Sequence, residues 1–258
     1  SVSSNITGGA NTVGHMTLDM GDMGTLSMDY NGDKHGLPAY SDKVPNAGEQ
    51  VWDHNTAAHG QPAQGIVNPR ADEGGTDDAL GYSVSMSGVT LSTHFMVANA
   101  DGSEASAVLV ADSLVDGLAI GAGMGNNRGS VASTNDDLET YFITYTAGAV
   151  TVGAQNSKKD ADTEYDIAGN ATTNNTDVER DSYGISFAVN ENLSISYGVS
   201  KTEFASTSIT SDEENKGISA SYTAGGMTVG LVHNQKDSAI GVSGTDQENT
   251  EISLAFAF

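Results

Sequence analysis

The stretch MTLDMGDMGTLSMDY, residues 16–30, predicts a β-hairpin whose pattern recurs along the chain. Apolar and polar residues alternate on both sides of a glycine-containing centre, which is the period of strands with one apolar face. Antiparallel pairing of the two apolar faces places Met20 opposite Leu26. This register leaves residues 22–24 as a three-residue loop, in which Gly24 takes the position that favours a left-handed backbone.

The same register predicts where two acidic residues of the hairpin lie. It sets Asp19 opposite Ser27 and Asp29 opposite Thr17, so the two carboxylates are diagonal neighbours on the polar face. An aspartate-rich run with glycines is also typical of a calcium loop, but calcium needs several oxygens that converge on one point. Two carboxylates on different strands are too splayed and too few, so we interpret them as polar groups on one wet surface.

Alternation with period two continues through most of the chain and is broken by two kinds of connection. Short glycine-containing turns join strand pairs, and two of these hairpins, YTAGAVTVGAQNSKKD at 145–160 and YTAGGMTVGLVHNQKD at 222–237, are near copies. Longer polar connections separate the pairs, and the longest covers residues 31–78. The pattern predicts about thirteen antiparallel strands with tight turns at one end and long loops at the other.

Composition excludes several classes of protein. The 258 residues include 10 Lys and Arg against 34 Asp and Glu, a formal net charge of -24, which would repel the phosphates of a nucleic-acid partner. The absence of cysteine excludes disulfides and thiolate chemistry. The sequence also lacks the run of about 20 apolar residues that a membrane helix needs, whereas alternating segments of about ten residues are the pattern of a transmembrane barrel.

The two faces of the predicted strands favour that barrel over a soluble β-sandwich. The polar face is rich in Gly, Ser and Thr, and loops are elaborated at one end only, as in outer-membrane barrels. Aromatic residues share the parity of the aliphatic ones, several of them near strand ends: Tyr30, Tyr82, Tyr145, Phe187, Tyr197 and Tyr222. Basic residues lie mostly in loops or at strand ends: Lys158, Lys159, Arg180, Lys201, Lys216 and Lys236. We therefore expect an all-β transmembrane antiparallel barrel with short periplasmic turns and long extracellular loops.

The chain resembles the general porins of the Gram-negative outer membrane. The hairpin at 16–30, the connection at 31–78 and the closing EISLAFAF, which ends on Phe258, carry the resemblance, and DKVPNAGEQVWD at 42–53 is most similar to porins of alphaproteobacterial type. The resemblance implies one barrel domain over residues 1–258, of a family with about sixteen strands. The count then predicts about three further strands upstream, unless SVSSNITGG forms an additional one.

The resemblance also implies a function and a set of residues. Porins form water-filled channels for passive diffusion of small hydrophilic solutes, so the loop 31–78 is expected to fold partly into the lumen as a constriction. Its acidic side would come from Asp42, Glu49 and Asp53 and its basic side from Lys43 and Arg70, with Asp19, Asp29 and His94 facing the lumen from the wall. The net charge predicts a cation preference. We expect the preference to be modest, because salt screens charges beyond about 8 Å.

In this family the protein is a homotrimer, contacts outer-membrane lipid and lipopolysaccharide, and is inserted by an assembly machinery that reads the terminal aromatic residue, here Phe258. No cofactor is expected, although acidic loop tracts at 160–166 and 211–215 could bind Ca²⁺ weakly. A secreted or surface calcium-binding β protein of adhesin type is the alternative. An enzyme is disfavoured, because His54 and His59 lack the spacing of a helical metal motif.

Overall fold

Fourteen antiparallel strands, each hydrogen-bonded to its neighbours in chain order, form one sheet in the computed structural model. They are β1 (Val2–Thr7), β2 (Ala10–Asp19), β3 (Thr25–Tyr30), β4 (Asp78–Met86), β5 (Val89–Asn99), β6 (Gly102–Ala111), β7 (Leu118–Arg128), β8 (Asn135–Ala147), β9 (Val150–Ala161), β12 (Asp177–Ala188), β13 (Leu193–Ala205), β14 (Glu213–Ala224), β15 (Met227–Asp237) and β16 (Gln247–Phe256). The strands β10 (Glu164–Tyr165) and β11 (Ala171–Thr172) pair only with each other. The structure describes residues 2–7, 10–30, 35–48, 50–51, 78–99, 102–128, 135–161, 164–165, 171–172, 177–205, 209 and 211–256.

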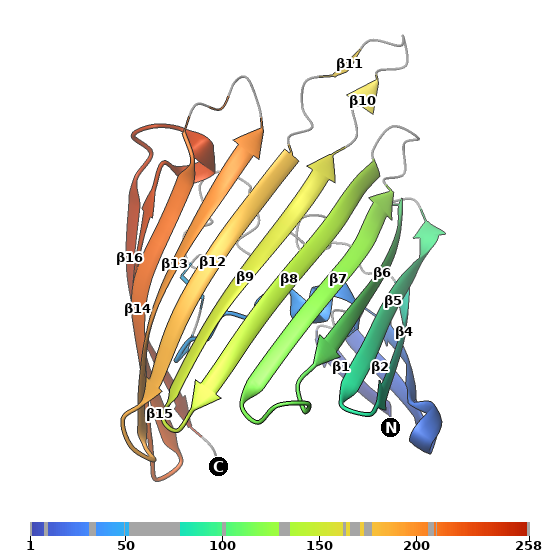
Figure 1. Ribbon diagram of the computed structural model, residues 1–258, viewed down its shortest axis with the longest axis horizontal. Coiled ribbons are helices and arrows are strands. Elements are labelled where there is room, and N and C mark those ends of the chain that lie inside the picture. The colour runs from blue at the N-terminus through green and yellow to red at the C-terminus, as the bar shows by residue number, and fades with distance from the viewer. Residues whose placement is uncertain are drawn as a thin grey trace.

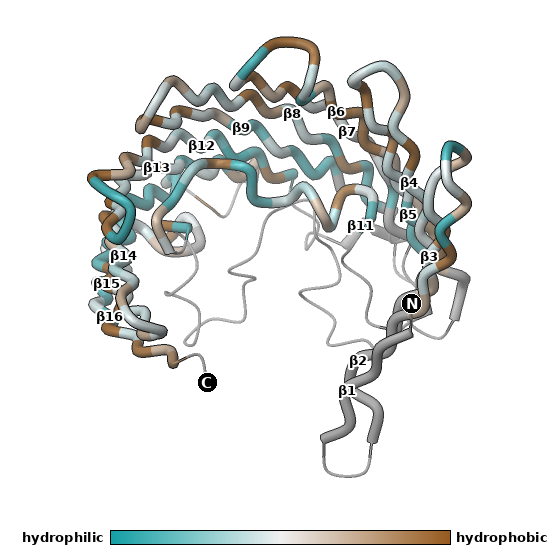
Figure 2. Tube along the Cα trace, turned by 90° about the horizontal axis from the view of Figure 1, so that it is seen from below, coloured by the Kyte–Doolittle hydropathy of each residue, from teal (hydrophilic) through white to brown (hydrophobic). Residues whose placement is uncertain are grey.

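The thirteen predicted strands are present, and β1 is the additional strand for which SVSSNITGG was the candidate. Tight turns join the pairs at one end of the sheet and the longer connections lie at the other, as the sequence predicts (Figure 1). The sheet curves strongly from β3 round to β16, so that it has an outer and an inner face (Figure 2). No helix in the described part of the chain is long and apolar enough to cross a membrane.

The predicted register of the first hairpin is wrong by two residues. In the structure Leu18 faces Leu26 and Asp19 faces Thr25, and the turn takes the five residues 20–24, including the 3₁₀ turn η1 (Gly21–Met23). A slip of two residues keeps every side chain on its own face, so alternation cannot distinguish the two registers. The turn decides between them, because the Asp19 carboxylate accepts a hydrogen bond of 2.9 Å from the N–H of Gly21.

The correction changes the relation between the two aspartates of the hairpin. Asp19 lies at the turn, while Asp29 is opposite His15 on β2 and Ala79 on β4. The two residues are therefore not diagonal neighbours. Asp19 is exposed and closes the turn locally, and the side chain of Asp29 lies outside the described residues.

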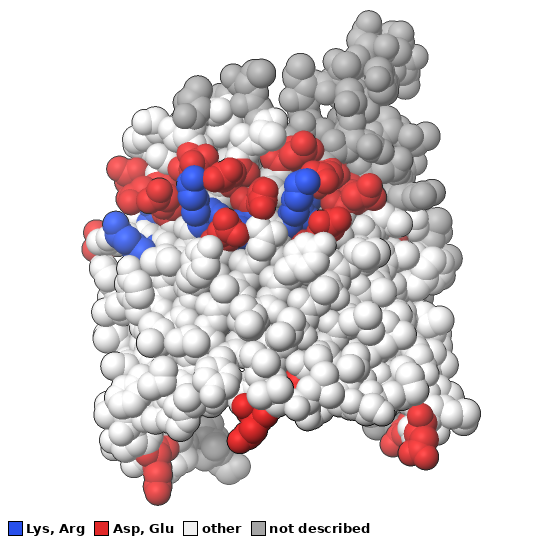
Figure 3. All heavy atoms as spheres, viewed as in Figure 1, with Lys and Arg blue, Asp and Glu red and all other residues white. Residues whose placement is uncertain are grey.

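The outer face is apolar and the inner face is small and polar. Large outward side chains are between 40% and 70% exposed, and they include Leu18, Leu109, Ile120, Met124, Ile143, Tyr145, Tyr183, Ile185, Phe187, Tyr197, Ile218, Tyr222, Leu231, Ile252 and Leu254. Buried inward positions of the same strands are occupied by Ser27, Ser92, Ser106, Thr140, Gln155, Ser182, Ser200, Asn215, Ser219 and Asn234. Charged atoms gather in a band beside the long loops, and the surface below that band is almost uncharged (Figure 3). This polarity is the reverse of a water-soluble sandwich and matches a wall between lipid and water.

Candidate functional site

The first described part of the long connection, residues 35–48 and 50–51, lies against the inner face of the sheet. It begins with the 3₁₀ turn η2 (Leu37–Tyr40), whose Leu37 is fully buried. Leu37 packs in a cluster with Val108, Val110, Leu138 and Phe142 from β6 and β8, and the Tyr40 ring stacks on Phe142 at 5.9 Å between centroids. The predicted loop thus has an apolar anchor that alternation in the strands does not reveal.

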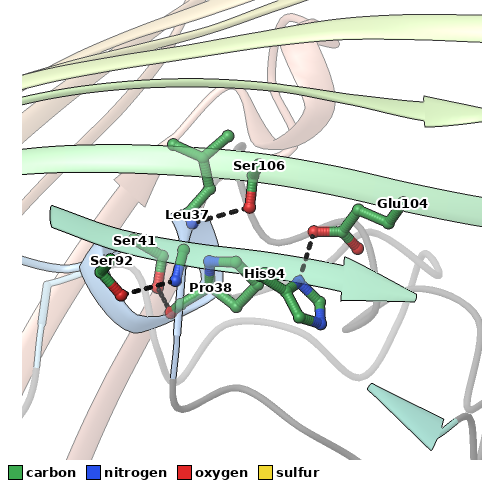
Figure 4. Close-up of polar contacts among 8 residues, drawn as sticks. Leu37, Pro38, Ser41, Ser92, His94, Glu104 and Ser106 are labelled. Carbon is green, nitrogen blue, oxygen red and sulfur yellow. Dashed lines mark hydrogen bonds and ion pairs between the residues drawn. The ribbon is translucent and has the colours of Figure 1, made fainter. Parts of the chain in front are cut away.

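Inward side chains of the wall hold the backbone of this segment. Ser92 and Ser106 accept hydrogen bonds of 3.0 Å from the N–H groups of Gly36 and Leu37 (Figure 4). Further along, the N–H of Ala47 donates to the hydroxyls of Ser196 at 2.9 Å and Ser219 at 3.2 Å. Five wall side chains on five strands accept from the segment in this way: Ser92, Ser106, Gln155, Ser196 and Ser219. The serines of the polar face therefore satisfy backbone donors that would otherwise be buried without partners.

A row of glycines lets the segment approach the wall closely. Gly153, Gly184, Gly198 and Gly217 are aligned in register on the adjacent strands β9, β12, β13 and β14. A Cβ at Gly153 would meet Pro45 Cδ at 2.6 Å, one at Gly184 would meet the Pro45 carbonyl oxygen at 2.7 Å, and one at Gly198 would meet Val51 Cγ1 at 3.0 Å. Atoms of Val44, Pro45 and Val51 fill the space beside Gly153, Gly184 and Gly198, whereas Asn234 of β15 fills the space beside Gly217. Mid-strand glycines in neighbouring hairpins were visible in the sequence, but only the register aligns them.

The wall residue His94 is buried at the start of the segment. Its Nδ1 lies 3.2 Å from Oε1 of Glu104 on β6, and both side chains are at most 3% exposed (Figure 4). Gly36 covers this pair, since a Cβ there would approach the β-carbon of His94. Among the described residues, His94 Nε2 and Glu104 Oε2 have no hydrogen-bond partner. Glu104 was not predicted, although its place on the inward parity of β6 follows from the apolar residues of that strand.

Asp42 and Lys43 are the two residues of the described segment that the sequence predicts as charges of the constriction. They are adjacent and half-buried. The Ser41 hydroxyl lies 3.2 Å from Asp42 Oδ2, and the ammonium of Lys43 lies 4.5 Å from the centre of the Tyr40 ring. Burial lowers the pKa of Lys43, and the negative charge of Asp42 opposes that change. The backbone N–H of Lys43 donates a hydrogen bond of 2.7 Å to Gln155 Oε1 on β9.

Three inward cations of the wall were missed as site residues. Lys236 lies 3.3 Å from Glu213 on the neighbouring strand, and Arg180 Nε donates to the Thr202 hydroxyl at 3.0 Å. The third, Lys159, is 4.0 Å from Asp136. The sequence places all three at strand ends, but their parity relative to the apolar residues of each strand would have assigned them to the inner face.

Several other predicted residues cannot be compared with the structure. Glu49, Asp53, Arg70 and Phe258 lie outside the described residues, as do the histidines 54 and 59 and most of the loop 31–78. Of the acidic loop tracts, Asp160 pairs with Lys158 at 2.8 Å and Asp212 with Lys201 at 2.8 Å. In the part of the chain that is described, no three His, Asp or Glu side chains are grouped so that they could hold a metal ion.

Comparison with known proteins gives no match at the level of sequence families or of curated proteins. Solved structures do match. A porin refined at 1.8 Å resolution superposes with a TM-score of 0.67 over 95% of this chain and 81% of its own, at 17% identity. An anion-selective porin from Comamonas acidovorans gives 0.63, covering 95% of this chain and 77% of its own, at 13% identity.

The fold is that of the outer-membrane porins. A loop-deletion mutant of OmpT, an outer membrane protein of Vibrio cholerae, also gives a TM-score of 0.63 over 96% of this chain and 80% of its own, at 12% identity. In the porin fold the outward apolar belt faces lipid and the inner wall faces water, which is the polarity found here. Residues 35–48 and 50–51 therefore lie on the water side of the wall.

Proposed function

We propose that this protein is an outer-membrane porin, a water-filled channel through which small hydrophilic solutes and ions diffuse passively. The observation that carries the proposal is the reversed polarity of the sheet, with a belt of exposed aliphatic and aromatic residues outside and serine, threonine and amide side chains inside. A soluble calcium-binding protein would leave that belt exposed to water, at a cost of about 25 cal/mol for each Å² of apolar surface. The protein is located in the outer membrane of a Gram-negative bacterium.

The loop 31–78 forms the constriction of this channel. Support comes from its described part, which is bonded to the inner wall at five strands and so lies where solutes pass. Asp42 and Lys43 are the described charges of the segment, and Glu49, Asp53 and Arg70 complete the set that sorts solutes by charge. The loop sets the size limit because its backbone takes up part of the cross-section that the wall encloses.

The channel prefers cations modestly. The net charge of -24 makes the local potential negative, whereas the inward cations Lys159, Arg180 and Lys236 oppose it on one side of the wall. Lys159 and Lys236 have carboxylate partners within 4.0 Å, so the acidic excess is only partly offset. Screening limits the preference, since the Debye length is about 8 Å at physiological ionic strength.

Planar-bilayer recording with detergent-purified protein tests the proposal. Single-channel steps are expected, and in a KCl gradient the reversal potential should have the sign of a cation-preferring pore. Asp42→Asn should reduce the cation preference, because it removes a charge from the constriction. The matched control is Asp116→Asn, which removes the same charge from an exposed tight turn. A protein that folds but gives no ion-conducting steps would contradict the proposal.

Assembly and ligands belong to the same proposal. The porin is a homotrimer in contact with lipid and lipopolysaccharide, and the outer-membrane assembly machinery reads Phe258. Light scattering of the purified protein measures the trimer, and deletion of Phe258 should lower the amount of assembled protein several-fold. Ca²⁺ binds weakly at the acidic outer loops, and calorimetric titration should detect it only at millimolar concentrations.

A further inference from the structure

Gln155 is a buried amide on the inner face of β9 that contacts the segment 35–48 at two backbone groups. Its Oε1 accepts the N–H of Lys43 at 2.7 Å, and its Nε2 donates to the carbonyl oxygen of Tyr40 at 2.8 Å. A backbone N–H can only donate and a carbonyl can only accept, so these partners settle which end of the amide is oxygen. Gln155 therefore closes the turn from Tyr40 to Lys43 with both ends of one side chain.

The amide is itself held from β8. Nε2 also donates to the hydroxyl of Thr140 at 2.9 Å, and Thr140 Oγ1 lies 3.1 Å from the hydroxyl of Ser157 and 3.2 Å from the carbonyl oxygen of Asn156. Thr140 is fully buried and Gln155 is 5% exposed. The wall thus restricts the rotamer of Gln155 through a bond that is separate from its two bonds to the segment.

The clamped turn determines where the charge of Lys43 lies. The Lys43 ammonium is 4.5 Å from the centre of the Tyr40 ring, which stacks on Phe142 of the wall with an interplanar angle of 12°. A lysine side chain on an unrestrained loop would sample many rotamers. Here Gln155 of the wall is hydrogen-bonded to the backbone at both ends of the turn. The Tyr40 ring beneath the ammonium packs on Phe142 of the wall.

We propose that Gln155 is a specificity-determining residue of the channel. It acts as a positioning residue, because it holds the turn 40–43 so that the Lys43 ammonium stays over the Tyr40 ring in the lumen. The inference rests on the proposed channel function. It adds that Gln155 of the wall determines the position of one charge of the constriction, that of Lys43. Sequence pattern assigns Gln155 only to a polar face. Its role follows from the two backbone contacts.

The protonation of Lys43 provides a readout of its environment. Burial lowers the pKa of Lys43, with Asp42 opposing, so the ammonium loses its proton at a lower pH than an ordinary lysine. Tyr40 belongs to the same turn, and its pKa is raised by burial and by the negative charge of Asp112. The ion pair of Lys159 and Asp136 lies further along β9 and β8. Loss of the clamp should expose Lys43 to water and return its pKa towards the ordinary value of about 10.4.

The test is the reversal potential in a KCl gradient, measured from pH 7 to pH 11 with the full chain in planar bilayers. Wild type should become more cation-selective as Lys43 deprotonates, and Lys43→Met should lack that part of the titration while keeping the tyrosine part. Gln155→Leu should move the Lys43 step to higher pH, towards that of an ordinary lysine. Gln235→Leu, an amide on the outward parity of β15, is the matched control and should leave the step in place.

A mutant cycle separates positioning from a general structural effect. In a Lys43→Met background, Gln155→Leu should leave the neutral-pH potential unchanged, and only the Tyr40 part of the titration should move. If Gln155→Leu shifts the potential equally with and without Lys43, or leaves the Lys43 step unmoved, the inference is wrong. If Gln155→Leu does not fold, as judged from heat-modifiable mobility on a gel, Thr140→Val replaces it and should shift the step in the same direction by a smaller amount. Folded wild type without ion-conducting steps would instead overturn the proposed channel.

Discussion

A methyl group at position 184 tests whether the position of the segment against the inner wall depends on the glycine row. Gly184 lies in register between Gly153 and Gly198, and a Cβ there would stand 2.7 Å from the Pro45 carbonyl oxygen and in still closer contact with Val44 Cγ1. Ordinary contacts of a Cβ begin at 3.4 Å, so the carbonyl oxygen must recede by at least about 0.7 Å, the difference between 3.4 and 2.7 Å. Gly184→Ala should therefore push the segment away from β12 and into the lumen.

The energetic cost follows from the same overlap. Extra methyl groups in a well-packed site cost about 1–3 kcal/mol. The segment takes most of this cost, since β12 is hydrogen-bonded on both sides to β9 and β13 and cannot retreat. We expect the free energy of unfolding to fall by about 1–3 kcal/mol while the barrel remains folded. Conductance should fall as well, because the displaced segment occupies more of the lumen.

Urea unfolding in lipid vesicles measures the first quantity and single-channel recording the second. Ser186→Thr is the matched control, because it adds one methyl group to the same face of the same strand, two residues from Gly184. If Gly184→Ala unfolds at the same urea concentration as wild type and conducts equally, the close approach of the segment to the glycine row is refuted.

Two further changes test the inner and outer faces. Ser196→Ala and Ser219→Ala should each lower the free energy of unfolding only slightly, because the Ala47 N–H bonds to both hydroxyls. The double variant leaves that donor without a serine partner and should lower the free energy of unfolding by about 1–3 kcal/mol. The two effects should therefore be clearly non-additive. Additive costs would show that the two serines do not share this donor. Ile185→Arg places a cation in the outward belt and should cost about 2–4 kcal/mol, whereas Ser186→Arg on the inward face should cost much less, and equal costs in vesicles would contradict the assignment of the faces.

The order and pairing of the strands could be predicted from the sequence because a strand with one apolar face leaves a period-two pattern at every position. The register of the first hairpin could not, since a slip of two residues preserves that pattern and the local bond from Asp19 to Gly21 selects the turn. The strand β1 was identified only as a candidate, because SVSSNITGG alternates weakly.

Prediction of the candidate site was more limited. Asp42 and Lys43 could be proposed, since they are charges on the long connection, and His94 could be assigned to the inner face from its parity. Gln155 and the glycine row could not be recognised as contacts of the segment. Each contacts residues that are far away in the chain. Lys43 and Gln155, for example, are 112 positions apart.

By itself the sequence determined an antiparallel sheet with a lipid-facing and a water-facing side, because alternation and the placement of charges are properties of each strand alone. The tertiary structure decided how the segment 35–48 and 50–51 is held. The glycines and the glutamine are visible in the sequence, but they form one contact surface only when strand register brings Gly153, Gly184 and Gly198 into one row and Gln155 under Tyr40 and Lys43.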